Sequence, residues 1–475
     1  TAARHFTLFQ LALDPADPTR YVVDGKPMEM TRRTVSVPMP DGAEPVERTL
    51  YSTIYGPLVA MPQVGLAWTD TMAFSMRDAN SANQRALGTW VRIAQATNVD
   101  DVRKAVTETL GIPWVNTIVA DRYGNALHAD VTSVPNVSAE KVAECATPFS
   151  GLVASRLTLL DGARSECNWT VTKGTPVPGL LPASEQAIQQ RRDSVTNSND
   201  SYWLSNASAP NKQLSPILGA WGEPVTLRTR ANFQETDAVL AIGPLTHERA
   251  QALAFSNRSL AAEMVVDPLL SVCEAEPAAK GACGVLAGWD RRVEIDSRGA
   301  FLFTTFWDKV SKRPDLWSTP FDPADPVNTP RDLNTQGEAG TKLLAALVEA
   351  AGEVEAKGIA LDAPWGEVQF APRNGTRIPI HGGPGDAGIL NVQYANPIEG
   401  GITPFHGTSY IQIVGFDEDG PVADAILSYS QSTNPASPHY ADQTEAYAIK
   451  AWNRLPFSPE EIEAARQGDV LRIAE

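Results

Sequence analysis

The sequence lacks any long apolar run. None approaches the roughly 20 residues that a membrane-spanning helix needs, so we expect no membrane insertion. The first residues, TAARHFTLFQLALDP (1–15), also lack the basic start, long apolar middle and cleavage site of a secretory signal peptide. Thr1 follows no initiator methionine, so we expect the chain to be a processed product or a fragment.

Positive charge is scarce as well. The 475 residues hold 39 lysines and arginines against 56 aspartates and glutamates, a formal net charge of −17. Such a chain repels nucleic acid and anionic lipid, so we expect neither as a partner. With 43% hydrophobic and 20% charged residues, the composition is that of a folded protein, and small neutral or apolar ligands remain open.

Several motifs that would indicate a function directly are absent. The sequence has no Walker A phosphate loop, no Gly-x-Ser-x-Gly nucleophile elbow and no His-Glu-x-x-His zinc helix. Its six histidines show no metal-ligand spacing. The glycine-rich HGGPGDAG (381–388) lacks the lysine of a phosphate loop, so we interpret it as a tight turn. We therefore expect no metal and no cofactor.

The four cysteines form two couples that are close in sequence, Cys145 with Cys167 and Cys273 with Cys283. Such couples suit two disulfides that close short loops, each worth about 2–4 kcal/mol. Two disulfides would imply an oxidising compartment, such as a periplasm or the outside of the cell. Four buried free thiols are the alternative, while the lack of a Cys-x-x-Cys pair disfavours zinc.

The residue pattern predicts strands mixed with peripheral helices. β-Branched and aromatic residues indicate strands over 49–61, 300–307, 409–416 and 425–432. Apolar periodicity and capping residues indicate helices over 98–111, 338–358 and 458–468. This mixture favours an α+β fold with large sheets. No repeat and no linker stands out, so the sequence alone places no internal domain boundary.

The stretch TNSNDSYWLSNASAP (196–210) crowds asparagines and serines around a single Tyr-Trp pair. Attack on an amide carbonyl creates an oxyanion, and a side-chain amide held in place can stabilise it by roughly 2.7–4 kcal/mol. An asparagine locked by neighbouring amides and aromatic rings would suit that role.

This stretch closely resembles the segment that supplies the oxyanion-hole asparagine in the penicillin acylase family of N-terminal-nucleophile hydrolases. The resemblance extends over nearly the whole chain, and within the family it is nearest to the acyl-homoserine-lactone acylases and aculeacin A acylases. The other matching motifs recur in order: HFTLFQLALDPADPTRYVVDGKP (5–27), YGPLV (55–59), RDAN (77–80), GIPWVNT (111–117), LRTR (227–230), IDSRGA (295–300), RIPIHGG (377–383), HGTSYIQIV (406–414) and SQSTNPASPHYADQT (430–444).

The resemblance implies a four-layer αββα sandwich with peripheral helices, and a self-cleaving precursor that yields an α and a β chain. By this resemblance Asn199 is the oxyanion-hole asparagine, and Arg228 is the arginine that helps to hold that asparagine and the substrate. Trp90, Trp114 and Val115 match positions that line the acyl-chain pocket. The plainer alternatives are that Asn199 bridges two loops, that Arg228 pairs with an acidic side chain, and that the two tryptophans are ordinary core.

The family's nucleophile is a serine at the start of the β chain, and its own α-amine is the base. The resemblance makes residues 1–475 most of that β chain and places the serine several tens of residues before Thr1. A nearby histidine and the backbone donor of the oxyanion hole would lie there too. A terminal threonine is a nucleophile in other enzymes, but TAARHFTLFQLAL is typical of an interior strand, so we do not expect Thr1 to take this role.

The function implied is that of a bacterial amidohydrolase, periplasmic or secreted, that works with an α chain as partner. It would remove the acyl group from N-acyl-homoserine lactones without a metal. An apolar pocket gains about 0.8 kcal/mol for each buried methylene, so we expect a preference for long acyl chains. Penicillins and other β-lactams, or cyclic lipopeptides of the aculeacin type, are alternative substrates. A non-catalytic binding remnant that lacks the nucleophile is the alternative outside the enzymes.

Overall fold

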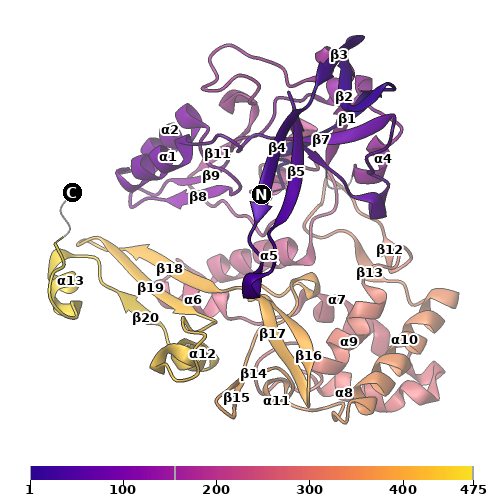
Figure 1. Ribbon diagram of the computed structural model, residues 1–475. Helices are drawn as coiled ribbons and strands as arrows, with labels where there is room; N and C mark the ends of the chain where they lie inside the picture. The colour runs from indigo at the N-terminus through magenta and orange to yellow at the C-terminus, as the bar shows by residue number, and fades with distance from the viewer. Residues whose placement is uncertain (1, 155–156, 473–475) are drawn as a thin grey trace. The chain divides into compact units, whose positions relative to one another are not determined.

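The computed structural model describes residues 2–154 and 157–472, apart from the side chain of residue 41. The expectation about Thr1 therefore lies outside the described residues. The contacts divide the chain into two compact units, Thr1–Gly222 and Glu223–Glu475 (Figure 1). Across the described ranges, no helix is both long and apolar enough to cross a membrane.

The first unit is built on an eight-stranded sheet with the order β3-β2-β1-β7-β6-β5-β4, in which β10 also pairs with β1. Its strands are β1 (Phe6–Asp14), β2 (Asp17–Val23), β3 (Lys26–Glu29), β4 (Thr31–Val37), β5 (Val46–Thr53), β6 (Gly56–Val59), β7 (Met72–Asp78) and β10 (Thr158–Asp161). β1 is antiparallel to β2 and β7 and parallel to β10. The interior strand predicted near the start of the chain is thus confirmed.

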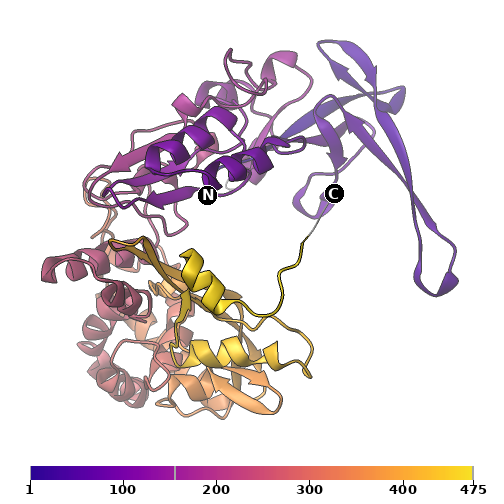
Figure 2. The same cartoon turned by 90° about the vertical axis from the view of Figure 1, so that its left-hand side faces the viewer.

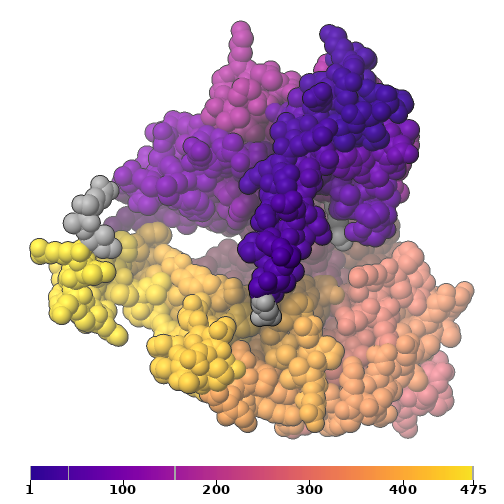
Figure 3. Space-filling view, viewed as in Figure 1, coloured from indigo at the N-terminus to yellow at the C-terminus, as the bar shows by residue number. Residues whose placement is uncertain are grey.

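Strands β4 and β5 form a hairpin that extends beyond the body of its sheet. Figure 2 shows this hairpin as a long ribbon on the right of the view, and Figure 3 shows it in indigo as a surface ridge. The strand predicted over 49–61 is in fact two strands, because the chain turns between Thr53 and Gly56. Gly56 has φ 129°, and a Cβ there would lie 2.2 Å from the carbonyl oxygen of Met76, so only glycine fits.

A smaller sheet with the order β11-β9-β8 completes the first unit together with four helices. These elements are β8 (Thr117–Ala120), β9 (Ala126–Asp130), β11 (Ala187–Arg191), α1 (Arg85–Ala94), α2 (Val99–Thr109), α3 (Ala139–Glu144) and α4 (Ser150–Val153). Helix α2 confirms the helix predicted over 98–111. The Asn98 side chain caps it by accepting from the Asp101 N–H at 3.0 Å, and Leu110 ends it in the left-handed region.

The second unit is mainly helical around one large core. Its helices are α5 (Leu227–Ile242), α6 (His247–Ala254), α7 (Leu260–Leu270), α8 (Lys280–Gly288), α9 (Ala300–Val310), α10 (Gly337–Ala356), α11 (Trp365–Val368), α12 (Asp442–Ala448) and α13 (Pro459–Ala465). Its strands are β12 (Trp317–Thr319), β13 (Arg331–Leu333), β14 (Phe370–Arg373), β15 (Thr376–Pro379), β16 (Gln393–Ile398), β17 (Gly401–Gly407), β18 (Tyr410–Phe416), β19 (Pro421–Leu427) and β20 (Asn453–Leu455).

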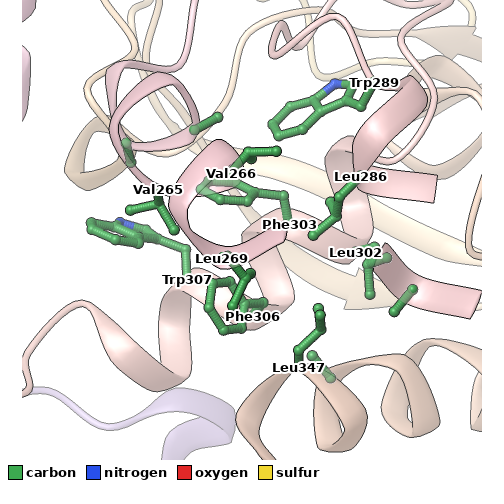
Figure 4. Packing of buried hydrophobic residues seen from close by; sticks show 14 of the residues in the cluster. Val265, Val266, Leu269, Leu286, Trp289, Leu302, Phe303, Phe306, Trp307 and Leu347 are labelled. Carbon is green, nitrogen blue, oxygen red and sulfur yellow. The ribbon is translucent and has the colours of Figure 1, made fainter. Parts of the chain in front are cut away.

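The strand predicted over 300–307 is wrong, because this segment is the buried helix α9. Figure 4 shows its Phe303, Phe306 and Trp307 within the core, near Val266 and Leu269 of α7. Buried residues surround most of this helix, so its apolar residues are not confined to one helix face. A continuous apolar run of this length is equally compatible with a buried strand or a buried helix, and here tertiary packing selects the helix.

The other predicted elements of the second unit are largely confirmed. Helix α10 reproduces the prediction over 338–358, and α13 reproduces the one over 458–468 with its Ser458–Glu461 capping box. Strand β18 matches 409–416. The strand predicted over 425–432 is only partly right, because β19 begins earlier, at Pro421, and ends at Leu427.

All four cysteines are in disulfides, and the pairing is the one suggested by their spacing. Cys145 bonds to Cys167 in the first unit, and Cys273 bonds to Cys283 in the second. The two couples are 22 and 10 residues apart in sequence, so each bond closes a short loop. The alternative of four free thiols is wrong.

Among the described residues, His5, His128 and His381 are buried, and the last two, one in each unit, are fully buried. His128 lies on β9, and neither of its ring nitrogens has a hydrogen-bond partner among the described residues. His381 is also fully buried, with Nδ1 near the side-chain amides of Asn257 and Asn391 and Nε2 at 2.9 Å from the Tyr447 carbonyl oxygen. Burial lowers the pKa of the His128 and His381 imidazoles to about 4.

These two histidines predict a loss of stability in mild acid. The unfolded chain takes up a proton near pH 6.5, whereas the folded chain resists it until about pH 4, so the free energy of unfolding falls as the pH drops between these values. Each shift corresponds to about 3 kcal/mol. In denaturant titrations from pH 7 to pH 4, the free energy of unfolding of His128→Leu should fall less than that of the parent. An unchanged slope for His128→Leu would contradict this account.

Candidate active site

Asn199 lies in the first unit, in the loop that follows β11, and its side chain is exposed. Its backbone has φ 72°, in the left-handed region that asparagine tolerates better than most residues. The side chain of Asn197 holds this conformation from both sides. It accepts from the Asn199 N–H at 2.8 Å and donates to the Asp200 carbonyl oxygen at 3.1 Å.

The aromatic pair in this loop anchors it to the core. Tyr202 and Trp203 are both buried, and the Tyr202 hydroxyl accepts from the Leu214 N–H at 2.8 Å. Two further amides bind backbone carbonyls: Asn211 donates to Tyr202 at 2.7 Å, and Asn206 donates to Ser194 at 2.9 Å. The crowded amides therefore fix the loop, and Asn199 is presented on an anchored support.

Arg228 lies in the second unit, in the first turn of α5, where it is half-buried. Thr226 caps this helix by accepting from the Thr229 N–H. The neighbouring Arg230 is different, because it is only 2% exposed and donates to the carbonyls of Val327 and Pro330 at 2.7 and 2.8 Å. Burial lowers its pKa to about 10. Of the two arginines in LRTR, Arg230 is thus part of the interior and Arg228 is the one that reaches the surface.

The three predicted pocket residues all lie in the first unit and are not ordinary core. Trp90, Trp114 and Val115 are 49%, 63% and 45% exposed. Trp90 belongs to an apolar face of α1 that also carries the exposed Leu87 and Val91, at the spacing of one helix face. Within the described residues the two tryptophans are therefore not enclosed in a core, and an apolar surface of this kind indicates contact with a ligand or another chain segment.

The segment that carries Trp114 begins in close contact with α1. A Cβ on Gly111 would lie 2.1 Å from the Thr89 hydroxyl oxygen and 2.8 Å from the Arg85 carbonyl oxygen, so glycine is required there. This contact ties the GIPWVNT segment to the helix that carries Trp90. Within the described residues, no group of three or more histidine, cysteine, aspartate or glutamate side chains could hold a metal ion.

Comparison with known proteins decides the family. The model of the penicillin amidase family matches residues 1–464. The chain belongs to this family. It therefore contains the family segments that the resemblance identified, from the first strands to the C-terminal region.

Proteins similar to this chain include acyl-homoserine lactone acylases and an aculeacin-A acylase. The chain is 40% identical to the acyl-homoserine lactone acylase PvdQ of Pseudomonas syringae pv. tomato, over 97% of this chain and 61% of that protein. It is 37% identical to the aculeacin-A acylase of Actinoplanes utahensis, over 100% of this chain and 62% of that protein. The chain thus spans about three fifths of the length of these relatives.

A solved structure extends the comparison to the fold. The thermostable penicillin G acylase from Alcaligenes faecalis matches 99% of this chain and 86% of its own, with a TM-score of 0.60 and 16% sequence identity. The penicillin amidase-family chain therefore shares the fold of that enzyme, with mixed helices and sheets.

Proposed function

We propose that this chain is most of the β chain of an amidohydrolase that removes the acyl group from N-acyl-homoserine lactones. The observation that carries the proposal is the anchored loop of Asn199, which presents an exposed amide on a fixed backbone. The relatives named as acyl-homoserine lactone acylases support this substrate class, and the family supports the reaction.

In the proposed reaction, the nucleophile is the N-terminal serine of the β chain, outside residues 1–475. Its α-amine takes the hydroxyl proton while the oxygen attacks the amide carbonyl. The Asn199 side-chain N–H donates to the oxyanion that develops on the carbonyl oxygen, where such a donor is worth roughly 2.7–4 kcal/mol. The C–N bond then breaks, the amine leaves with the proton, and water releases the fatty acid from the serine ester.

Arg228 has a supporting role in this proposal. Its guanidinium carries a permanent positive charge and five donors in a planar fork, which suits it to hold Asn199 and substrate oxygens in one orientation. Arg228 lies in the first turn of α5 and is half-buried, whereas Arg230 is fully enclosed, so Arg228 is the arginine of this pair that supports the proposal.

The acyl pocket and the partner chain are proposed together. We propose that Trp90, Trp114 and Val115 line the pocket and that an α chain from the same precursor covers the rest of the apolar face of α1. The exposure of Leu87 and Val91 supports a covering segment, as does the greater length of the relatives. Assembly with the missing segments would complete the four-layer αββα sandwich, and the two disulfides support a periplasmic or secreted location.

A second candidate function rests on one comparison. The aculeacin-A acylase is nearly as similar to this chain as the acyl-homoserine lactone acylases are, so cyclic lipopeptides of that type are the alternative substrates. Both substrate classes combine an apolar acyl chain with an amide, and the proposed catalytic groups would serve either.

A rate panel on the full-length, matured protein tests the function. We expect the highest kcat/KM for a long-chain N-acyl-homoserine lactone, with lower values for a four-carbon analogue, for penicillin G and for an aculeacin-type lipopeptide. Highest activity on the lipopeptide would replace the substrate assignment. No amide hydrolysis by the matured protein would favour the non-catalytic remnant.

The chain of residues 1–475 alone is the matched control. We expect it to release no amine, because the proposed nucleophile lies outside it. Clear release would show that Thr1 or another group within this chain is the nucleophile, and the account of the serine would then be wrong.

A further inference from the structure

The glycine-rich segment 381–388 forms the wall against which the first turn of α5 packs. A Cβ on Gly388 would lie 2.7 Å from the Leu260 Cβ and 3.3 Å from the Leu227 Cβ. A Cβ on Gly385 would lie 3.5 Å from the Arg228 Nε. The motif that sequence reasoning treated only as a tight turn thus lies against Leu227 and the proposed site arginine, Arg228.

The space around Gly385 is tight, whereas its backbone conformation is open to any residue. Its φ lies outside the left-handed region, so any residue could adopt its conformation, in contrast to Gly382 with φ 89°. The point where its Cβ would stand is surrounded by three side chains. It is 3.1 Å from Val392 Cγ2, 3.2 Å from the Tyr394 hydroxyl oxygen and 3.5 Å from Arg228 Nε. The phenol and the guanidinium therefore approach the same small gap.

Hydrogen bonds from two helices hold this segment in place. The Trp307 indole N–H donates to the Asp386 carbonyl oxygen at 3.1 Å, and the Ser259 hydroxyl donates to the Ala387 carbonyl oxygen at 3.1 Å. Both donors come from buried side chains. The wall beside Arg228 is consequently rigid, because it is fastened to the core of the second unit.

Tyr394 provides a polar atom on the other side of the gap. It lies on β16, 37% exposed, with its ring nearly parallel to that of His406 at a centroid distance of 6.1 Å. Burial and the negative charge of Asp386 raise the pKa of its phenol, and the positive charge of Arg228 and a hydrogen bond with the Gly385 backbone oppose that rise. The phenol is therefore neutral at neutral pH, and its oxygen can accept a hydrogen bond from a guanidinium.

We propose that Gly385 and Tyr394 are positioning residues for Arg228, the glycine by leaving room for the guanidinium stem and the tyrosine by restricting its rotamers. This inference rests on the proposed role of Arg228. A mobile arginine side chain loses about 2 kcal/mol of rotamer entropy when it is fixed in one conformation. Neighbouring groups that exclude its other rotamers therefore reduce the cost of orienting the guanidinium toward the substrate.

A double-mutant cycle on the full-length, matured enzyme tests the proposal. We expect Tyr394→Phe to lower kcat about 10-fold with little change in KM, because it removes the polar atom that borders the same gap as the guanidinium. In an Arg228→Ala background, the same change should have no effect on kcat. Gly385→Ala should behave like Tyr394→Phe, because its methyl displaces the phenol and touches the guanidinium.

Two substitutions serve as matched controls. Tyr410→Phe removes an exposed hydroxyl from β18 of the same unit, and Gly352→Ala adds a methyl in α10 where nothing lies within 4 Å. Both should leave kcat unchanged.

The outcomes separate this inference from the proposed function. Equal losses of kcat for Tyr394→Phe in both backgrounds would mean a general structural role and would overturn the proposal, as would no loss in either. If Arg228→Ala itself leaves kcat unchanged, the function proposed for Arg228 is wrong. The denaturant midpoints of the four proteins then decide the positioning claim, because non-additive shifts support a contact between Tyr394 and Arg228 and additive shifts exclude it.

Discussion

Replacing the proposed oxyanion donor Asn199 by aspartate in the full-length, matured protein should lower kcat by about 10²–10³-fold. Aspartate has nearly the same shape, but its carboxylate cannot donate to an oxyanion and repels the developing charge. KM should change less than kcat, because the interaction is made in the transition state. Single-turnover measurements of acyl release from a long-chain N-acyl-homoserine lactone would check the result.

The backbone of Asn199 determines which substitutions are informative. At φ 72° an alanine would be strained by about 1–2 kcal/mol, so Asn199→Ala would mix loop distortion with loss of the donor. Asn199→Gly removes the amide without that strain and should match Asn199→Asp. Asn206→Asp is the control, because the Asn206 amide donates to the Ser194 carbonyl and should affect stability more than turnover. Near-normal turnover in Asn199→Asp would show that the oxyanion donor is another group.

Removing Trp90 and Trp114, the tryptophans proposed to line the acyl pocket, should abolish the proposed preference for long acyl chains. If Trp90 and Trp114 each contribute about 1.5 kcal/mol of apolar contact to a long chain, the double alanine variant should lower kcat/KM for a twelve-carbon substrate by about 100-fold. The value for a four-carbon substrate should change little, because a short chain does not reach the same surface. Initial rates on both substrates give the ratio directly.

Trp68 offers a matched control for this prediction. It is a partly exposed tryptophan of the same unit, 37% exposed, and its ring packs edge-on against Tyr51. Trp68→Ala should leave the ratio of long-chain to short-chain rates unchanged. Parallel losses on both substrates in the Trp90 and Trp114 variant would mean that these residues support the fold or the partner chain and do not line the pocket.

Local patterns in the sequence were sufficient to predict several helices, the disulfides and the Asn199 loop. Three helices were predicted from residues that lie within a few turns of one another: the apolar face and C-terminal end of α10, the capping box of α13 and the N-cap of α2. At this range, the spacing of residues in the sequence fixes which helix face or cap they form. The cysteine pairing followed from proximity in sequence in the same way. The loop of Asn199 was recognisable because the residues that hold it, such as Asn197, are its close neighbours.

The tertiary structure alone decided the rest, because the deciding contacts join distant segments. The run over 300–307 is a helix since the core surrounds it, which its composition cannot reveal. Arg228 and Arg230 belong to the same LRTR motif, yet only Arg230 is buried, where it donates to the carbonyls of Val327 and Pro330. Tyr394 and Arg228 border the same gap, although several helices separate them in the sequence. The sequence by itself determined the family, the disulfides and the local anchoring of the Asn199 loop, and long-range packing determined which side chains surround the proposed site arginine.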